Sequence, residues 1–176
     1  MLESAHEFFS RGGYDRTGVA AILKRANLQA PTLYHHFQDK EGLYVAWAVQ
    51  ILGKLEVSLK EISDRQGSLR ESLVECTKVF MRSSVDLRQM LHDIEHLENP
   101  ANRDGLIGVY QHGAYSPIYT IISRGYHRKE CKQDATRPMI ETFMAGALAQ
   151  GALWDSPTET QKGAEWWVSL FLGGVA

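Results

Sequence analysis

The chain has 176 residues, of which 44% are hydrophobic and 23% are charged, and its formal net charge at pH 7 is -2. These fractions are those of a folded globular protein and exclude an intrinsically disordered chain. The slight excess of acid gives no overall positive field for a nucleic acid, although one local basic patch is sufficient for DNA binding.

The two cysteines and the apolar segments indicate a cellular compartment. Cys76 and Cys131 lie far apart in sequence, without the spacing of a zinc site or a disulfide framework, which favours a reducing environment. The first residues lack the order of a signal peptide, and the most apolar segment, residues 166–176, is too short to span a bilayer. We therefore expect a cytoplasmic protein with no membrane partner.

Apolar residues repeat at helical spacing from the start of the chain. A first helix is predicted from Leu2 to Gly12–Gly13, because glycine commonly closes a helix. Thr17 is expected to cap a second helix, and Asn27, which tolerates left-handed backbone, to end it. A third helix is predicted to open with Pro31, since the first turn of a helix needs no amide donor there.

Two longer helices are predicted next. Asp39 is a good cap for a helix that reaches Ile62. After a polar break, helical spacing resumes at Leu69 and predicts a helix that runs towards Leu97 with a bend near Ser83–Ser84.

The rest of the chain is also helical in pattern, so the predicted fold class is all-α. Pro117 should kink or interrupt the helix in which it lies. The predicted segments are, in order, a loop over 99–105, a helix over 106–126, a polar linker over 129–135, and helices over 137–154 and from 158 to the end.

Residues 17–37 fit a helix-turn-helix, in which the second of two short helices enters the major groove of DNA. Glutamine and threonine can hydrogen-bond base edges, and a small alanine fits beside a thymine methyl group. The alternative is that both helices are ordinary parts of a core with polar surface residues. The positions expected to be exposed are Gln29, Ala30, Thr32, Tyr34, His35 and His36.

A longer pattern runs from Leu2 to about Trp47. It consists of Ala5, Phe8, Phe9, Gly13, Tyr14, Thr17, Val19, Ile22, the run 32–37, Lys40, Glu41 and Leu43. With this pattern the region resembles the TetR family of transcriptional repressors. Asn27 stands where that family usually has glycine, which asparagine can mimic. The resemblance implies a three-helix DNA-binding domain at residues 1–47 and a larger helical effector-binding and dimerisation domain at residues 48–176.

The resemblance also implies DNA-contacting residues. The backbone-contacting positions of the family map onto Tyr34 and Lys40, and Thr17 is expected to contact a phosphate. One short helix reads few bases, so we expect a homodimer on a pseudo-palindromic operator in double-stranded DNA. The base-contacting positions map onto Gln29, Ala30, Pro31, Thr32 and His35.

The last two helices are implied, by the same resemblance, to pair two protomers. Residues 142–153 are rich in glycine and alanine, which let helices approach closely, and the last helix adds large apolar residues. The alternative is an intramolecular helix pair in the core. The residues expected at the dimer interface are Phe143, Ala147, Leu148, Gly151, Trp167, Leu170 and Phe171.

An effector pocket for an unidentified small molecule is expected between residues 79–97 and 106–126. These stretches supply apolar walls with a few polar groups, as small-molecule sites do. The alternative is plain hydrophobic core. The residues expected to line the pocket are Phe80, Met90, Ile94, Tyr110, Tyr115 and Tyr119.

Metal and enzyme chemistry are weakly indicated. His92 and His96 stand one helical turn apart, a spacing that can bind zinc, but the segment lacks the HExxH order. A solvated polar face is the favoured interpretation, and we expect neither a metal nor another cofactor. The sequence has no recognisable nucleophile elbow, phosphate loop or catalytic carboxylate pair, so no enzyme activity is expected.

The sequence therefore predicts a dimeric, sequence-specific DNA-binding transcriptional regulator, a repressor that a small-molecule effector releases. The alternative is a helix-turn-helix-like protein that has lost DNA binding and serves as a ligand-binding or protein-interaction module. The near-neutral charge of the predicted reading head is what supports this alternative.

Overall fold

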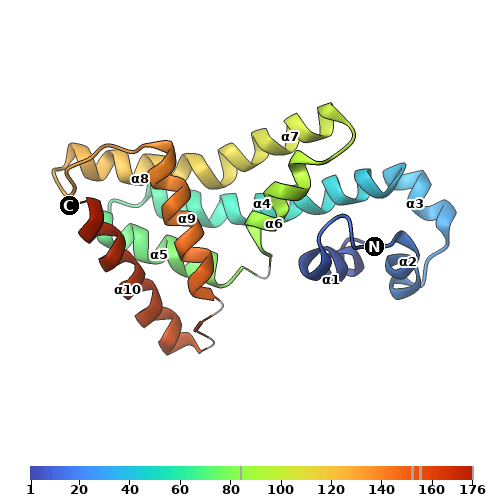
Figure 1. The fold of residues 1–176 in the computed structure, drawn as a ribbon, viewed down its shortest axis with the longest axis horizontal. Helices are drawn as coiled ribbons and strands as arrows, with labels where there is room; N and C mark the ends of the chain where they lie inside the picture. Colours follow the sequence, from blue (N-terminus) through green and yellow to red (C-terminus); the bar gives the residue numbers. More distant parts are fainter. Residues whose placement is uncertain (84, 152, 155, 176) are drawn as a thin grey trace. The chain divides into compact units, whose positions relative to one another are not determined.

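The computed structural model describes residues 1–83, 85–151, 153–154 and 156–175. The described part of the chain is helical throughout and contains no strand, which confirms the all-α prediction (Figure 1). No helix in this part is long and apolar enough to cross a membrane. The elements are α1 (Leu2–Gly12), α2 (Val19–Ala26), α3 (Ala30–Phe37), α4 (Lys40–Asp64), α5 (Leu69–Met81), α6 (Leu87–Glu95), α7 (Pro100–Tyr110), a π-helical turn η1 (Gln111–Tyr115), α8 (Ser116–His127), α9 (Arg137–Gly151) and α10 (Pro157–Val175).

The chain forms two compact units that are each discontinuous in sequence. Residues 1–53 and 84–110 form the first unit, and residues 54–83 and 111–176 form the second. The helices α6 and α7 therefore belong to the same compact unit as the first three helices. The predicted functional boundary at residue 47 stays a prediction.

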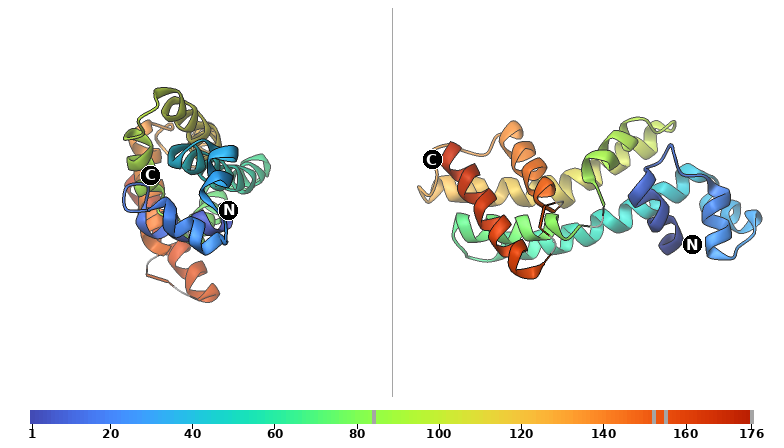
Figure 2. Two further views of the ribbon diagram at one scale, coloured as in Figure 1. Left: turned by 90° about the vertical axis from the view of Figure 1, so that its right-hand side faces the viewer. Right: turned by 60° about the horizontal axis from the view of Figure 1, so that its bottom comes forward.

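The first unit is built around aromatic side chains. Phe9, Tyr44 and Trp47 are nearly or completely buried, and the ring of Phe9 meets those of Tyr44 and Trp47 at centroid distances of 5.0 and 5.3 Å. Helix α2 packs against both α1 and α3, and α3 leads directly into the start of α4 (Figures 1 and 2). The burial of these large rings is a strong source of stability for the first unit.

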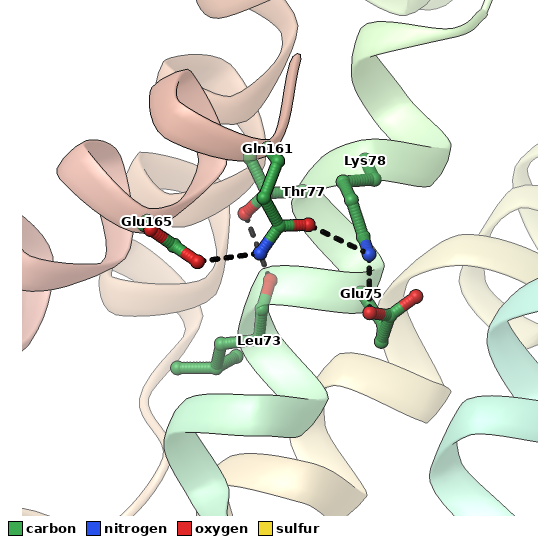
Figure 3. Close-up of polar contacts among 6 residues, drawn as sticks. All are labelled: Leu73, Glu75, Thr77, Lys78, Gln161 and Glu165. Atoms are coloured by element: carbon green, nitrogen blue, oxygen red, sulfur yellow. Dashed lines mark hydrogen bonds and ion pairs between the residues drawn. The ribbon is translucent and has the colours of Figure 1, made fainter. Parts of the chain in front are cut away.

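The second unit is built around α5. This helix packs against α8, α9 and α10, and α9 also packs on α10 (Figure 2). Polar contacts join α5 to α10: the ammonium of Lys78 donates to the amide oxygen of Gln161 at 3.1 Å and is paired with Glu75 (Figure 3).

Helix ends in the first unit follow the predictions except at Thr17. Gly13 closes α1 with φ 66°, and Asn27 closes α2 in the left-handed conformation with φ 53°. Asp39 caps α4, since its Oδ1 accepts from the Gly42 amide at 2.7 Å. The prediction that Thr17 caps α2 is wrong: the N-cap is Gly18, and the Thr17 hydroxyl donates backwards to the Gly13 carbonyl at 2.7 Å.

The predicted helix from Leu69 towards Leu97 is two helices. α5 ends at Met81, and α6 begins at Leu87 because the side chain of Asp86 caps it, accepting from the Arg88 amide at 2.9 Å. Ser84, at the predicted bend, lies outside the described residues, as do Ala152, Asp155 and Ala176.

The predicted loop over 99–105 is helical, so that prediction is wrong. Pro100 opens α7, and the side chain of Asn99 caps it by accepting from the Ala101 amide at 3.0 Å. An Asn-Pro pair has the composition of a loop, but the same pair is a cap followed by a first-turn proline. The expected interruption at Pro117 is confirmed, because η1 lies immediately upstream and Pro117 occupies the first turn of α8.

Candidate nucleic-acid interface

The helix-turn-helix consists of α2 and α3, joined through the left-handed Asn27. The inner face of the pair is apolar: Ile22 on α2 and Leu33 on α3 are completely buried. Both helices are only eight residues long, so packing on this face, rather than helix propensity, holds them in place.

The outer face of α3 is polar and exposed. Tyr34, beside the buried Leu33, has 61% of its surface accessible to solvent, and Thr32 is half-buried. This face brings together all the predicted base-contacting residues and Tyr34. Its exposed members are Gln29, Ala30, Pro31, Tyr34, His35 and His36.

The connection from α3 to α4 is very tight. Gln38 has a positive φ of 68°, and the Asp39 amide donates to the Phe37 carbonyl at 2.8 Å, which makes a γ-turn at Gln38. A Cβ on Gly42 would lie 1.9 Å from the same carbonyl oxygen, so only glycine fits there. The turn holds Tyr34 and Lys40, the two predicted backbone-contacting residues, within one rigid junction.

Lys40 is held against an aromatic ring. Its ammonium lies 4.2 Å from the centroid of the Tyr14 ring, a cation–π arrangement. Burial, followed by the negative charge of Glu41, raises the pKa of Tyr14 to about 12, so its phenol stays neutral under the lysine. The Gly13–Tyr14 pair was noted in the sequence only as part of the family resemblance, and nothing local in the sequence indicates the ring contact.

Thr17 differs from the other predicted DNA contacts because it is buried. Its side chain is only 4% exposed, and its hydroxyl is engaged with the Gly13 carbonyl. Its predicted phosphate contact stays a prediction.

Two buried carboxylates tie α6 and α7 to the rest of the first unit, and sequence reasoning gave neither this role. Asp93 on α6 is 4% exposed, and its Oδ2 accepts from the Tyr14 amide at 2.8 Å and from the Tyr44 hydroxyl at 3.2 Å. Glu41 on α4 is 7% exposed and accepts from the Glu98 amide at 2.9 Å and from the Asn102 side chain at 2.8 Å.

His92 on α6 and His96 at its C-cap form an exposed pair whose rings are tilted by 47°. Their ring centroids are 4.3 Å apart, and Nδ1 of His96 lies 2.8 Å from the His92 carbonyl oxygen. Among the described residues, no group of three or more potential metal-ligating side chains gathers around them or elsewhere.

The residues predicted to line an effector pocket are divided between the two units. Phe80, Tyr115 and Tyr119 belong to the second unit, and Met90, Ile94 and Tyr110 belong to the first. Phe80, Met90 and Ile94 are buried, whereas Tyr119 is 43% exposed. Their assembly into one pocket stays a prediction.

The residues predicted at a dimer interface are partly used inside the chain. Phe143, Ala147 and Phe171 are buried between α9 and α10, and Nε1 of Trp167 donates to the Phe143 carbonyl at 3.2 Å. Leu148 and Gly151 are half-buried. Leu170 is 56% exposed, and Trp166, another of the large apolar residues of the last helix, is 55% exposed.

Comparisons with known proteins agree with this geometry. The family model described as "Bacterial regulatory proteins, tetR family" matches residues 1–47. The HTH-type transcriptional repressor BdcR of Escherichia coli K12 is 26% identical over 154 residues, which cover 85% of this chain and 76% of BdcR. Residues 1–47 of the chain therefore form a DNA-binding domain of the TetR family.

The solved TetR family structures that it resembles extend the match to the whole chain. PfmR from Thermus thermophilus has a TM-score of 0.75 at 20% identity and covers 99% of this chain and 98% of its own. AibR, in complex with isovaleryl coenzyme A and operator DNA, has a TM-score of 0.78 at 19% identity, covering 97% and 95%. With this N-terminal domain and this fold, the chain is a DNA-binding transcriptional regulator of the TetR type, with an N-terminal helix-turn-helix domain and a helical C-terminal domain.

Proposed function

We propose that this TetR family regulator is a homodimeric repressor that binds a pseudo-palindromic operator and leaves it when a small-molecule effector binds. The observation that carries the proposal is the outer face of α3, where polar side chains are exposed around the 61%-exposed Tyr34 while Leu33 anchors the inner face. A helix with one anchored apolar face and one exposed polar face suits insertion into the major groove.

Base and backbone contacts would divide along this face. Gln29 and Thr32, at the start of α3, carry groups that hydrogen-bond base edges. Tyr34 and Lys40 flank the junction between α3 and α4, where a hydroxyl and an ammonium suit phosphate oxygens. Ala30, Pro31 and His35 complete the exposed set.

Dimerisation would use the outer side of α9 and α10. Trp166 and Leu170 lie one turn apart on α10 and expose more than half of their surface, above the buried Phe143 and Phe171. Exposed aromatic and aliphatic side chains over a packed layer favour a two-fold interface that is formed by the same patch on both protomers. A two-fold dimer would set two α3 helices about 34–36 Å apart, one turn of DNA.

A repressor role and the binding of a small-molecule ligand are supported by similar proteins, whereas release of the operator is part of our proposal. BdcR is a repressor by name, and the AibR complex holds both an acyl coenzyme A and operator DNA. In this chain an effector would favour a conformer whose α3 helices no longer match successive major grooves. Thioesters of coenzyme A are a reasonable first class of compounds to screen.

The test is selection of random duplex DNA on the purified protein, followed by sequencing of the retained duplexes. An enriched inverted repeat is expected, and it would supply the probe for an effector screen by displacement. Absence of enrichment at low salt would contradict the proposal and favour the alternative that the helix-turn-helix no longer binds DNA.

A further inference from the structure

The position of the Lys40 ammonium depends on the ring beneath it. Lysine has a flexible four-carbon stem, and Lys40 stands in the first turn of α4 between two acidic neighbours, Asp39 and Glu41. The ring of Tyr14, 4.2 Å from Nζ, gives the ammonium a defined resting place on the half-buried surface of the first unit.

The ring of Tyr14 is itself fixed by contacts within the first unit. Its backbone amide donates to Oδ2 of Asp93 at 2.8 Å, and its ring packs edge-on against Tyr44 with centroids 5.2 Å apart. Gly13, with φ +66°, turns the chain towards this carboxylate, and a Cβ on Gly13 would lie 2.9 Å from Oδ2.

Asp93 is a fully engaged buried carboxylate. Besides the Tyr14 amide, it accepts from the Tyr44 hydroxyl at 3.2 Å and from the Gln89 side chain at 2.8 Å. Burial and the neighbouring Asp93 charge raise the pKa of Tyr44, which keeps its hydroxyl a donor. Asp93 lies on α6, far outside the residues 1–47 that match the family's DNA-binding domain.

We propose that Asp93 and Tyr14 are positioning residues for DNA binding: Asp93 holds Tyr14 in place, and the ring of Tyr14 presents the Lys40 ammonium to the DNA backbone. The inference rests on the proposed backbone contact of Lys40. Helix α6, which lies outside residues 1–47, thereby helps to position the phosphate-binding lysine.

The salt dependence of DNA affinity separates this role from a purely structural one. Each phosphate contact that is lost lowers the slope of log affinity against log salt by about one. A variant that is merely less stable lowers the melting temperature but keeps the slope of its folded fraction. The full chain is titrated with a labelled duplex of random sequence over a range of salt, and thermal unfolding is recorded in parallel.

The decisive variants are Lys40→Ala, Tyr14→Leu and their combination. Lys40→Ala should lower the slope by about one for each bound head. Tyr14→Leu, which removes the ring, should lower the slope in the same direction, and the double variant should lose no more than Lys40→Ala. Tyr14→Phe is the matched control: it keeps the ring and should keep the slope.

Asp93 is tested in the same way. Asp93→Ala should lower the slope. Asp93→Asn should restore it, because the asparagine carbonyl still accepts from the Tyr14 amide and the Tyr44 hydroxyl, while its amide can face a flipped Gln89 side chain. An unchanged slope in both Tyr14→Leu and Asp93→Ala would overturn the inference.

A measurement on the free wild-type protein tests the contact between Lys40 and the Tyr14 ring even if some of the variants do not fold. In the free wild-type protein, the side-chain methylene protons nearest Nζ of Lys40 should be shifted upfield by the Tyr14 ring, with the signal assigned from Lys40→Arg. Shifts equal to those of the exposed Lys24 and Lys54 would refute the ring contact. Failure of the wild type to bind any duplex would instead contradict the proposed function. An unchanged salt dependence of DNA affinity in Lys40→Ala would contradict both the contact of Lys40 with the DNA backbone and this inference.

Discussion

At the scale of single residues, the junction between α3 and α4 contains one position where glycine is required and one where a residue other than glycine has a positive φ. Gly42 is required, because any side chain would collide with the Phe37 carbonyl. Gln38 is not a glycine although its φ is 68°, a region that costs most residues about 1–2 kcal/mol. The first unit therefore carries backbone strain at Gln38, directly after α3.

Replacement of Gln38 by glycine should relieve this strain. We expect Gln38→Gly to raise the free energy of unfolding by about 1 kcal/mol, measured by urea denaturation. Gln50→Gly, at an exposed position inside α4, is the matched control and should lower it by roughly 1 kcal/mol. Equal destabilisation by both changes would show that Gln38 is not strained.

Base-reading residues should affect specificity rather than overall affinity. Thr32→Ala or Gln29→Ala is expected to change base preference at one position of each half-site by about 1–3 kcal/mol. The measurement is affinity for a set of operators with single base changes. A uniform loss across all of them would contradict direct base contact and resemble the loss of a backbone contact.

The thiol of Cys76 should be inert in the folded protein. It is completely buried, and burial raises its pKa far above the ordinary range of cysteine, so almost no thiolate forms at pH 8. We expect a thiol reagent to label Cys76 only after denaturation, as read by mass spectrometry of the labelled peptide. Rapid labelling of the native protein at pH 8 would contradict the burial of this thiol.

At the scale of elements, caps decide where helices start, and most of these are visible in the sequence. Asp39 and Asn27 act as predicted, whereas the Asn99–Pro100 pair was assigned to a loop although it starts α7. Whether an Asn-Pro pair belongs to a loop or starts a helix depends on whether the residues after it pack against the rest of the protein. Residues of α7 do so, because the Asn102 side chain donates to the Glu41 carboxylate, 61 residues away in sequence.

The capping box at the start of α5 should contribute measurably to stability. Ser68 Oγ accepts from the Glu71 amide at 3.2 Å, and the Glu71 carboxylate accepts from the Ser68 amide at 3.0 Å. Ser68→Ala should lower the free energy of unfolding by about 1 kcal/mol and the melting temperature by roughly 2–4 °C. Ser58→Ala, inside α4, should change neither by a comparable amount, and equal effects would refute the capping role.

At the scale of the whole molecule, the dimer proposal rests on Trp166 and Leu170. Leu170→Glu should weaken self-association by roughly a hundredfold or more, because an unpaired charge in an interface is costly. Light scattering after size-exclusion chromatography should show a monomer with unchanged helix content. Val57→Glu is the control, since Val57 is 61% exposed on α4 and outside the proposed interface. A dimeric Leu170→Glu protein would contradict the proposed interface.

Some of this protein was determined by sequence alone. Most helix positions, the helix-turn-helix and the match to the TetR family follow from residues close together in the chain, within 1–47 for the family match. Local periodicity, caps and turn residues leave signals at fixed short spacings, and these are visible without a structure.

Other features were decided only by tertiary structure. One glycine of α9 that suggested a dimer seam is Gly146, where a Cβ would lie 2.1 Å from the Trp167 ring of the same chain. Asp93, which no motif of the sequence singles out, accepts a hydrogen bond from the Tyr14 amide across 79 residues. Such contacts join residues that are far apart in sequence, so no short sequence pattern predicts them. The partner of a buried carboxylate or a close-packed glycine is set by the tertiary packing and not by its neighbours in sequence.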